Sequence, residues 1–480
     1  MAGITTTHAQ YESTRAQWER IRDAVAGSDA VKARGSTYLP ALSEQTRDEY
    51  AAYLTRAMYF NTPRRTVQAL LGAVMRKDPS ITIPSILAPF IQDATCNGVS
   101  FNALTKTTLG EVLQTGRCGV LVDMPTQADE PARPYCVLYQ AESIVNWSDD
   151  MTGGVPVLRR VILLEHVHEE DATDPYVMKT IEQYRELYLE DGIYHQQLWR
   201  KQRHLQRGTD EWVRYEDAIT PVVKGAPFDF IPFCFFSPTT LTAAVEIPPL
   251  LDLCDVAISH FRSSADLEHG RHHTALPTPW ITGLDNKNAS LKIGSTVAWV
   301  IPPDTAKVGM LEFTGQGLGT LEKALEHKER LMAVLGARLL EEQKKTVESS
   351  DTLAMRYSGE QSVLRSAANT VSDGLSQCLQ WAALWTGVKP EAAAKAVVRL
   401  NTDFIDNQMS FAEMTELVKS WQAGAISYDT MYALMEKGEV TRPGITAEKE
   451  QAQIEIERPA QLPQNINPMT GLPDPELNAE

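Results

Sequence analysis

Two histidines in one short stretch come closest to the spacing of a metal site. His166 and His168 are separated by one residue, so on a β-strand their side chains face the same side. Two imidazoles can begin a zinc site, which would make the protein a metal-dependent hydrolase. No third ligand stands at a suitable spacing, and the pair lies in an acidic run. The simpler interpretation is a solvated acidic face, and the hydrolase is kept as a remote alternative.

The sequence contains no complete catalytic or phosphate-binding motif. The glycines between residues 315 and 319 lack the Lys-Ser/Thr of a phosphate-binding loop. No GxSxG, HExxH or CxxC motif occurs. We therefore expect a protein that is not an enzyme and that holds no cofactor or resident metal. The other candidate pairs are His272-His273, Asp149-Asp150 and Glu341-Glu342.

Length, charge and cysteines exclude several classes of protein. A chain of 480 residues exceeds one ordinary hydrophobic core, so we expect several sub-domains. The net charge of -17 argues against a nucleic-acid binder with a broad basic face. The six cysteines lie far apart, as expected for reduced thiols of a protein made in a cytosol. No apolar run is long enough to span a membrane.

The stretch from about residue 247 to 385 organises the chain. Apolar residues recur at helical spacing from Leu250 to Ala265, and Gly270 is expected to end this helix. A Gly/Pro-rich excursion follows, with a strand expected at residues 295–301. A second helix, about 40 Å long, is expected from Leu318 to about Lys345. Two long helices that leave and return around a small module are typical of a ring-shaped assembly.

The flanking regions differ in composition. Helices are expected from residue 10 to 73, and strand-like stretches between residues 118 and 237 predict a mixed α+β domain. From residue 441 the chain is rich in proline and charge, so we expect an extended tail.

Three stretches together resemble one family. The first is Gly116-Arg-Cys-Gly-Val-Leu-Val-Asp-Met-Pro125, followed by the segments 133–139 and 142–147. The second is Ile247-Pro-Pro-Leu-Leu-Asp-Leu-Cys-Asp-Val-Ala-Ile-Ser-His-Phe-Arg-Ser-Ser-Ala-Asp266. The third is Gln422-Ala-Gly-Ala-Ile-Ser427. In their order, and in the helix–excursion–helix topology, the chain resembles the portal proteins of tailed bacteriophages. It resembles specifically the broad group of these proteins that was first catalogued as phage proteins of unknown function.

The resemblance implies an α+β portal-like fold with a mixed α/β wing, two long stem helices, a small α/β clip, a tunnel loop and a helical C-terminal crown region. The implied division is wing 1–246, stem helix 247–272, clip 273–317, stem helix 318–345, tunnel loop 346–358, wing-return helix and strand 359–400, crown region 401–440 and acidic proline-rich tail 441–480.

The resemblance also implies a function and partners. Twelve subunits would form a ring-shaped channel at one capsid vertex, through which double-stranded DNA passes without sequence specificity. The ring would bind the terminase motor, then the head–tail adaptor, beside the major capsid and scaffolding proteins, and would be assembled in the host bacterial cytoplasm. The alternative is another ring or adaptor protein of the virion.

The resemblance assigns site residues to two segments. Those of the tunnel loop, in the DNA channel, are Lys344, Lys345, Glu348, Asp351 and Arg356. Those of the clip, which would dock the motor and the adaptor, are Trp280, Asp285, Lys287, Lys292 and Trp299.

The tunnel loop generates a prediction about DNA. Exposed ion pairs are worth only about 0–1 kcal/mol each, but every subunit of a ring meets the same duplex. Changing Lys344 and Lys345 to Glu should leave assembly intact and lower DNA packaging or retention in a salt-dependent way. Capsids of the double mutant that fill and hold full-length genomes at every salt concentration would contradict the channel position.

Overall fold

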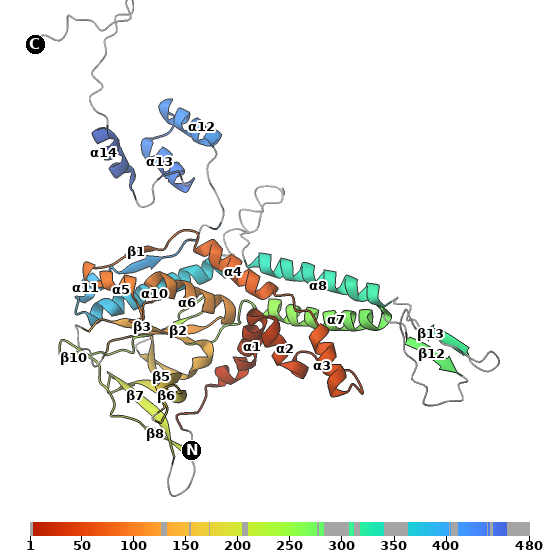
Figure 1. Cartoon of the computed structure of the whole chain (residues 1–480). Helices are drawn as coiled ribbons and strands as arrows, with labels where there is room; N and C mark the ends of the chain where they lie inside the picture. Colours follow the sequence, from red (N-terminus) through yellow and green to blue (C-terminus); the bar gives the residue numbers. More distant parts are fainter. Residues whose placement is uncertain are drawn as a thin grey trace, which may run out of the picture. The chain divides into compact units, whose positions relative to one another are not determined.

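The computed structural model describes residues 3–125, 132–152, 155–171, 173–203, 210–275, 278–282, 307–311, 317–339, 363–402, 404, 411–438, 440–441 and 445–457. The chain forms two compact units, Met1–Thr402 and Asp403–Glu480. Helices and antiparallel sheets alternate along the first unit, so the expected mixed α+β fold is confirmed (Figure 1).

The first unit begins with helices that the sequence caps in recognisable ways. Thr46 and Glu49 form a capping box at the start of the third helix, and Asn61 caps the fourth, which has Pro63 in its first turn. Trp18 is fully buried and donates its indole N–H to the carbonyl of Thr115 at 3.0 Å. The helices are α1 (Ala9–Ala26), α2 (Ser28–Ala33), α3 (Arg47–Arg56) and α4 (Thr62–Val74).

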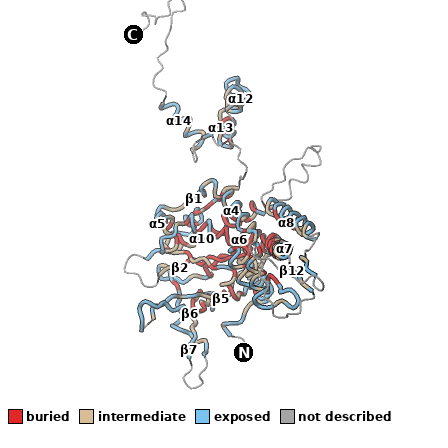
Figure 2. The backbone as a smooth tube through the Cα atoms, turned by 45° about the vertical axis from the view of Figure 1, so that its right-hand side comes forward, coloured by how far each residue is buried: buried red, intermediate tan, exposed pale blue. Residues whose placement is uncertain are grey.

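A three-stranded antiparallel sheet lies at the centre of this unit. Its order is β11 (Phe233–Phe236), β2 (Cys118–Asp123), β3 (Tyr135–Gln140), and every residue of β2 is buried. The helices α6 (Phe101–Thr115) and α10 (Val363–Trp385) both contact β2. Figure 2 shows the buried residues concentrated in these elements.

A five-stranded meander continues the chain after β3. Its strands pair in sequence order, and Asp191-Gly192 makes the turn between the third and fourth with positive φ at both residues, as a type I′ hairpin requires. The strands are β4 (Ile144–Thr152), β5 (Val155–Glu170), β6 (Met178–Glu190), β7 (Ile193–Arg203) and β8 (Asp210–Arg214).

Short elements complete the body. β1 (Ser80–Thr82) pairs with β14 (Val397–Arg399), and β9 (Val222–Val223) pairs with β10 (Ala226–Pro227). The short helices are η1 (Gly35–Thr37), η2 (Ser85–Leu87), α5 (Ala88–Gln92), η3 (Ala141–Ser143) and α11 (Pro390–Ala393).

Two long helices, α7 (Leu251–Ala275) and α8 (Leu318–Arg338), extend from this body side by side (Figure 1). Between them β12 (Thr278–Thr282) pairs with β13 (Lys307–Leu311). A turn closed by the backbone N–H of Leu251 and the carbonyl of Pro248 precedes α7. The expected end of this helix at Gly270 is wrong, because α7 continues to Ala275. Gly270 does not adopt the left-handed conformation of a helix C-cap, and the Thr274 hydroxyl donates to its carbonyl at 2.7 Å.

The second unit is a small set of helices, α12 (Phe411–Gln422), α13 (Tyr428–Lys437) and α14 (Ala447–Glu457). The expectation of an extended chain from residue 441 onward is wrong for α14. This helix contains no proline and is rich in Ala, Glu and Gln. Thr446 precedes it, and the hydroxyl of Thr446 accepts from the backbone N–H of Lys449. Local helix propensity therefore prevails over the regional composition.

A partly buried ion-pair network connects α1 to α6. The guanidinium of Arg22 donates to both carboxylate oxygens of Glu111, at 3.0 and 2.5 Å, and to Glu142 at 2.9 Å. Burial by itself would lower the pKa of Arg22, but the hydrogen bonds that it donates to Glu142 and Glu111 outweigh burial and raise that pKa. The charge of Arg22 therefore depends on both carboxylates.

Because of this network, we expect a glutamate-to-glutamine substitution to cost more stability at position 111 than at the exposed position 19. Glu111→Gln should lower the free energy of unfolding by about 1.5–3 kcal/mol, because a mostly buried guanidinium loses a charged partner. The control Glu19→Gln removes the exposed Arg15–Glu19 pair and should cost about 0–1 kcal/mol. Urea unfolding of both variants measures the difference, and equal losses would show that the buried network adds nothing.

Candidate functional site: the stem pair and the tip hairpin

We call α7 and α8 the stem pair, and β12 with β13 the tip hairpin. One side of α7 packs against the N-terminal helices, where Phe261 and Ala265 are fully buried. Polar contacts reinforce this side. The Tyr53 hydroxyl donates to Asp266 at 2.5 Å, and Ser264 accepts from the backbone N–H of Met58 at 3.0 Å. The base of the stem pair is therefore anchored by α3 and the segment that follows it.

The other side of α7 faces α8 through polar groups. The ammonium group of Lys328 donates to the Ser259 carbonyl at 2.9 Å and to the Ser263 hydroxyl at 2.6 Å. Burial lowers the pKa of Lys328. His260 Nε2 lies 3.3 Å from a carboxylate oxygen of Glu329. Burial lowers the pKa of His260 even though Glu329 opposes the shift.

These contacts show that the two helices run antiparallel. Toward the tip hairpin, Gly270 meets the first residue of α8, because a Cβ at Gly270 would lie 2.6 Å from a methyl group of Leu318. Nearby, Arg271 donates to Glu322 at 2.8 Å and to Glu268 at 2.8 Å. A side chain at position 270 would therefore have to displace the side chain of Leu318.

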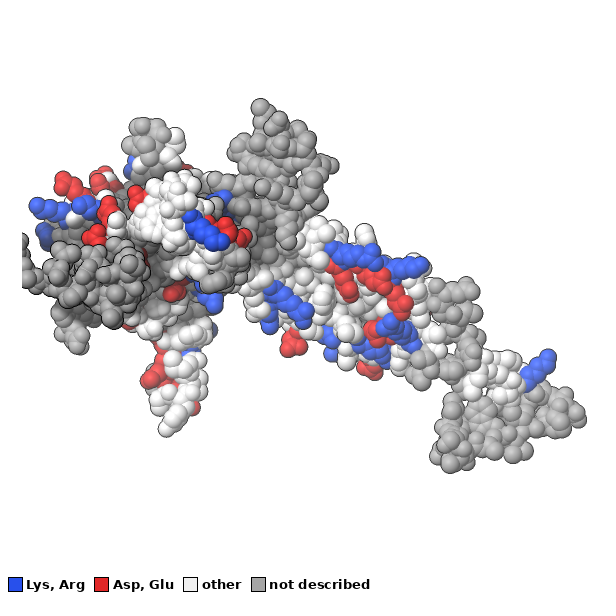
Figure 3. Space-filling model, turned by 90° about the horizontal axis from the view of Figure 1, so that it is seen from above, with Lys and Arg blue, Asp and Glu red and all other residues white. Residues whose placement is uncertain are grey.

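The outward face of α8 combines opposite charges with exposed apolar side chains. Leu331 is 38% exposed and Val334 is 46% exposed. Glu326 and Arg330 form an exposed pair at 3.3 Å. Figure 3 shows basic and acidic side chains interspersed along the stem pair. A face of this kind offers apolar area and both signs of charge to a neighbouring surface.

The tip hairpin exposes large apolar side chains on both of its faces. Trp280 lies opposite Gly309, whose missing side chain leaves room for the indole ring. Trp280 is 41% exposed on this face. On the opposite face, Val308 is 43% and Met310 is 55% exposed. Among the described residues, the two strands pair only with each other.

Of the site residues predicted from the sequence, the structure describes only Trp280, on β12. The strand expected at 295–301 and the tunnel loop at 346–358 lie outside the described residues, so their placement stays a prediction. The remaining predicted site residues that lie outside are Asp285, Lys287, Lys292, Trp299, Lys344, Lys345, Glu348, Asp351 and Arg356.

The histidines of the metal hypothesis lie on β5 as expected, and both are exposed. His168 Nδ1 lies 3.1 Å from the Thr180 hydroxyl on the adjacent strand. In the part of the chain that the structure describes, no three His, Cys, Asp or Glu side chains are grouped as metal ligands. Nor does that part include a helix with the length and apolar character of a membrane span.

Two features, one in the stem pair and one in the tip hairpin, were not predicted from the sequence. Lys328 lies on the same helical stripe as the buried Leu325 and Met332, and a lysine on an apolar stripe is a signal for a buried polar contact. The short run Trp280-Ile-Thr282, rich in β-forming residues, was passed over in favour of residues 295–301.

The stem pair and the tip hairpin lie within a segment that matches a model of a sequence family. Residues 249–386 match the model described as "Domain of unknown function (DUF4055)", a segment that runs from the start of α7 to the end of α10. No curated protein matches the chain.

Several solved structures show a distant similarity. The chain is 12% identical to a protein in the neck of a native GTA particle computed with C12 symmetry, with TM-score 0.38, over 83% of this chain and 95% of that one. Against the neck of an empty GTA particle computed with C6 symmetry, the identity is 12%, the TM-score 0.40 and the coverage 82% and 94%. For the virion of a native gene transfer agent particle the values are 11%, 0.38, 85% and 98%. These TM-scores are low, so function has to be argued from the geometry of this chain.

The contact between Gly270 and Leu318 can be tested with a matched pair of substitutions. Gly319→Ala, at a helical glycine with open space around it, should raise stability by about 0.4–1 kcal/mol. Gly270→Ala should lose this gain, because its methyl group displaces Leu318 and separates the helices. Thermal unfolding monitored by circular dichroism compares the two variants, and an equal stabilisation by both would contradict the close approach.

Proposed function

We propose that this chain is the portal subunit of a tailed phage or phage-like particle. About twelve copies form a ring at one capsid vertex, and double-stranded DNA enters and leaves through its channel. The role is structural and not catalytic. The observation that carries the proposal is the tip hairpin at the end of the stem pair, where apolar side chains are exposed on both faces.

A two-stranded hairpin is marginal in water by itself, and each strand has an outer edge with backbone groups that can pair. A heterologous ring gives every subunit one neighbour on each side. Such a ring would cover both faces of the tip hairpin in the same way in every subunit. Covering Trp280, Val308 and Met310 would remove apolar surface from water, which favours assembly.

The charges on the stem pair support a channel that does not hold DNA tightly. Phosphate binding grows with the number of cations that contact the backbone. On α8 the exposed Arg330 is paired with Glu326, and Arg271 on α7 is paired with Glu322. Interspersed charges of this kind allow brief phosphate contacts and prevent a continuous basic track.

The expected partners follow from the two ends of such a ring. The tip hairpins would together form a rim that binds the terminase motor and later the head–tail adaptor. The body would contact the major capsid and scaffolding proteins around the vertex. The assembled ring is thus a component of the virion.

The purified full-length chain tests the proposal directly. Negative-stain images and native mass spectrometry should show rings of about twelve subunits with a central hole. Trp280→Ser should shift the population toward smaller species, because it removes apolar area at the contact between neighbours. Tyr176→Ser is the matched control, since Tyr176 is also an exposed aromatic residue but lies between β5 and β6.

A wild-type chain that remains a compact monomer at all concentrations would overturn the ring. If Trp280→Ser and Tyr176→Ser both left the rings intact, the tip hairpin would not be the contact between neighbours. Exchange of residues 274–317 for a short linker should in turn leave the body folded and prevent the joining of tails.

A further inference from the structure

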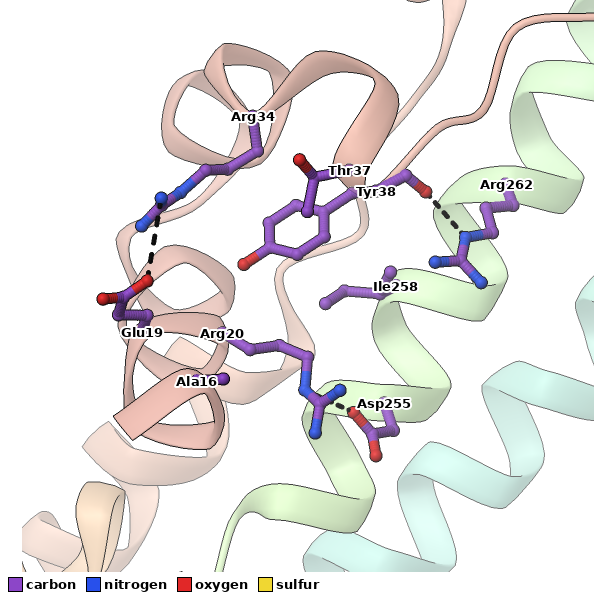
Figure 4. A pocket seen from close by; sticks show the side chains of 9 residues that line it. All are labelled: Ala16, Glu19, Arg20, Arg34, Thr37, Tyr38, Asp255, Ile258 and Arg262. Atoms are coloured by element: carbon purple, nitrogen blue, oxygen red, sulfur yellow. Dashed lines mark hydrogen bonds and ion pairs between the residues drawn. The ribbon is translucent and has the colours of Figure 1, made fainter. Parts of the chain in front are cut away.

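A charged pocket lies between α1, η1 and α7, away from the tip hairpin. Its volume is about 400 Å³. Figure 4 shows Ile258 on its floor, with Arg20 from α1 and Arg262 from α7 beside it. A third guanidinium, that of Arg34, lines the pocket from its other side. Three guanidinium groups in one pocket stand out in a chain with a net charge of -17.

Arg34 is the guanidinium that is already satisfied. Its Nε and Nη2 donate to the Asp23 carboxylate at 2.7 and 3.4 Å, and its Nη1 lies 3.9 Å from Glu19. The Tyr38 hydroxyl also donates to Asp23, at 2.6 Å. These hydrogen bonds hold the side chain of Arg34 in place at one side of the pocket.

Arg262 has donor capacity left over. Its Nε donates to the Tyr38 carbonyl at 2.6 Å, which fixes the direction of the side chain. Its two terminal nitrogens make no hydrogen bond to the part of the chain that the structure describes. Because arginine presents these groups in a planar fork, Arg262 is prepared to bind two oxygens of one ligand.

Arg20 is only partly satisfied. Its Nε lies 2.9 Å from a carboxylate oxygen of Asp255, but it is shielded from water and makes no well-directed hydrogen bond. Burial raises the pKa of Asp255 although both Arg20 and Arg262 oppose the shift. The side chain of Asp255 is 47% exposed, so this carboxylate can turn toward water while another anion takes its place beside Arg20.

From this geometry we propose that the pocket is a binding site for an oxyanion, a phosphate or carboxylate group that bridges Arg20 and Arg262. The ligand approaches over Ile258 and accepts hydrogen bonds from the terminal nitrogens of Arg262. Asp255 competes with it for Arg20. The site joins residues more than 220 positions apart in sequence, so it exists only while α1 and α7 are packed together.

The test uses sulfate as a mimic of phosphate and glutarate as a mimic of carboxylate side chains. Each is titrated into the full-length protein by calorimetry at constant ionic strength. We expect saturable binding, weakened at least tenfold by Arg262→Gln and strengthened several-fold by Asp255→Asn. Arg271→Gln is the matched control, because it removes the same charge from the same helix outside the pocket. Whichever anion binds more tightly identifies the preferred ligand class.

Two results would overturn the site. One is the absence of saturable binding of either anion in both the wild type and Asp255→Asn. The other is an equal loss of binding in Arg262→Gln and Arg271→Gln, which would show a general effect of charge. The Arg262→Lys variant keeps the positive charge but loses the planar guanidinium, so it should bind the anion with intermediate affinity. This variant separates a loss of binding from a folding defect in Arg262→Gln. Circular dichroism confirms that each variant is folded.

Discussion

A long helix that extends from a folded body must cover its apolar face, and α7 packs against two different surfaces. Phe261 and Ala265 pack into the core formed with the N-terminal helices. His260 and Ser263 face α8. The direction of α7 is thus fixed by the body, and the position of α8 and of the tip hairpin follows from the direction of α7.

Directional contacts fix the register between α7 and α8. A slip of one helical turn, about 5.4 Å, would separate Lys328 from Ser263 and would move Leu318 away from Gly270. Apolar contacts by themselves tolerate such shifts more easily than hydrogen bonds do. In the ring that we propose, a stem pair with one register would place every tip hairpin at the same height, which a closed ring of identical subunits requires.

The body that supports the stem pair contains a buried charge of its own. Arg117 is fully buried between aromatic rings, with its guanidinium 4.1 Å from the ring centre of Trp147 and 4.7 Å from that of Phe235. It donates to the carbonyl of Ala243 at 2.8 Å. Burial lowers the pKa of Arg117 to about 9, so the side chain remains charged at neutral pH. The aromatic faces replace part of the lost hydration and hold the segment before α7 against the sheets.

Local sequence patterns determined much of the secondary structure: the mixed α+β fold, the long helices after Pro249 and after Gly317, and the Asp191-Gly192 turn. The family resemblance assigned Trp280 to the clip and the loop residues to a channel, and both roles remain predictions. Periodicity reports which side of an element is apolar, but not which distant element will cover it. Only the tertiary structure therefore revealed that Gly270 is a point of close approach, and that α1 and α7 bring Arg20 and Arg262 into one pocket, because packing between distant segments creates both.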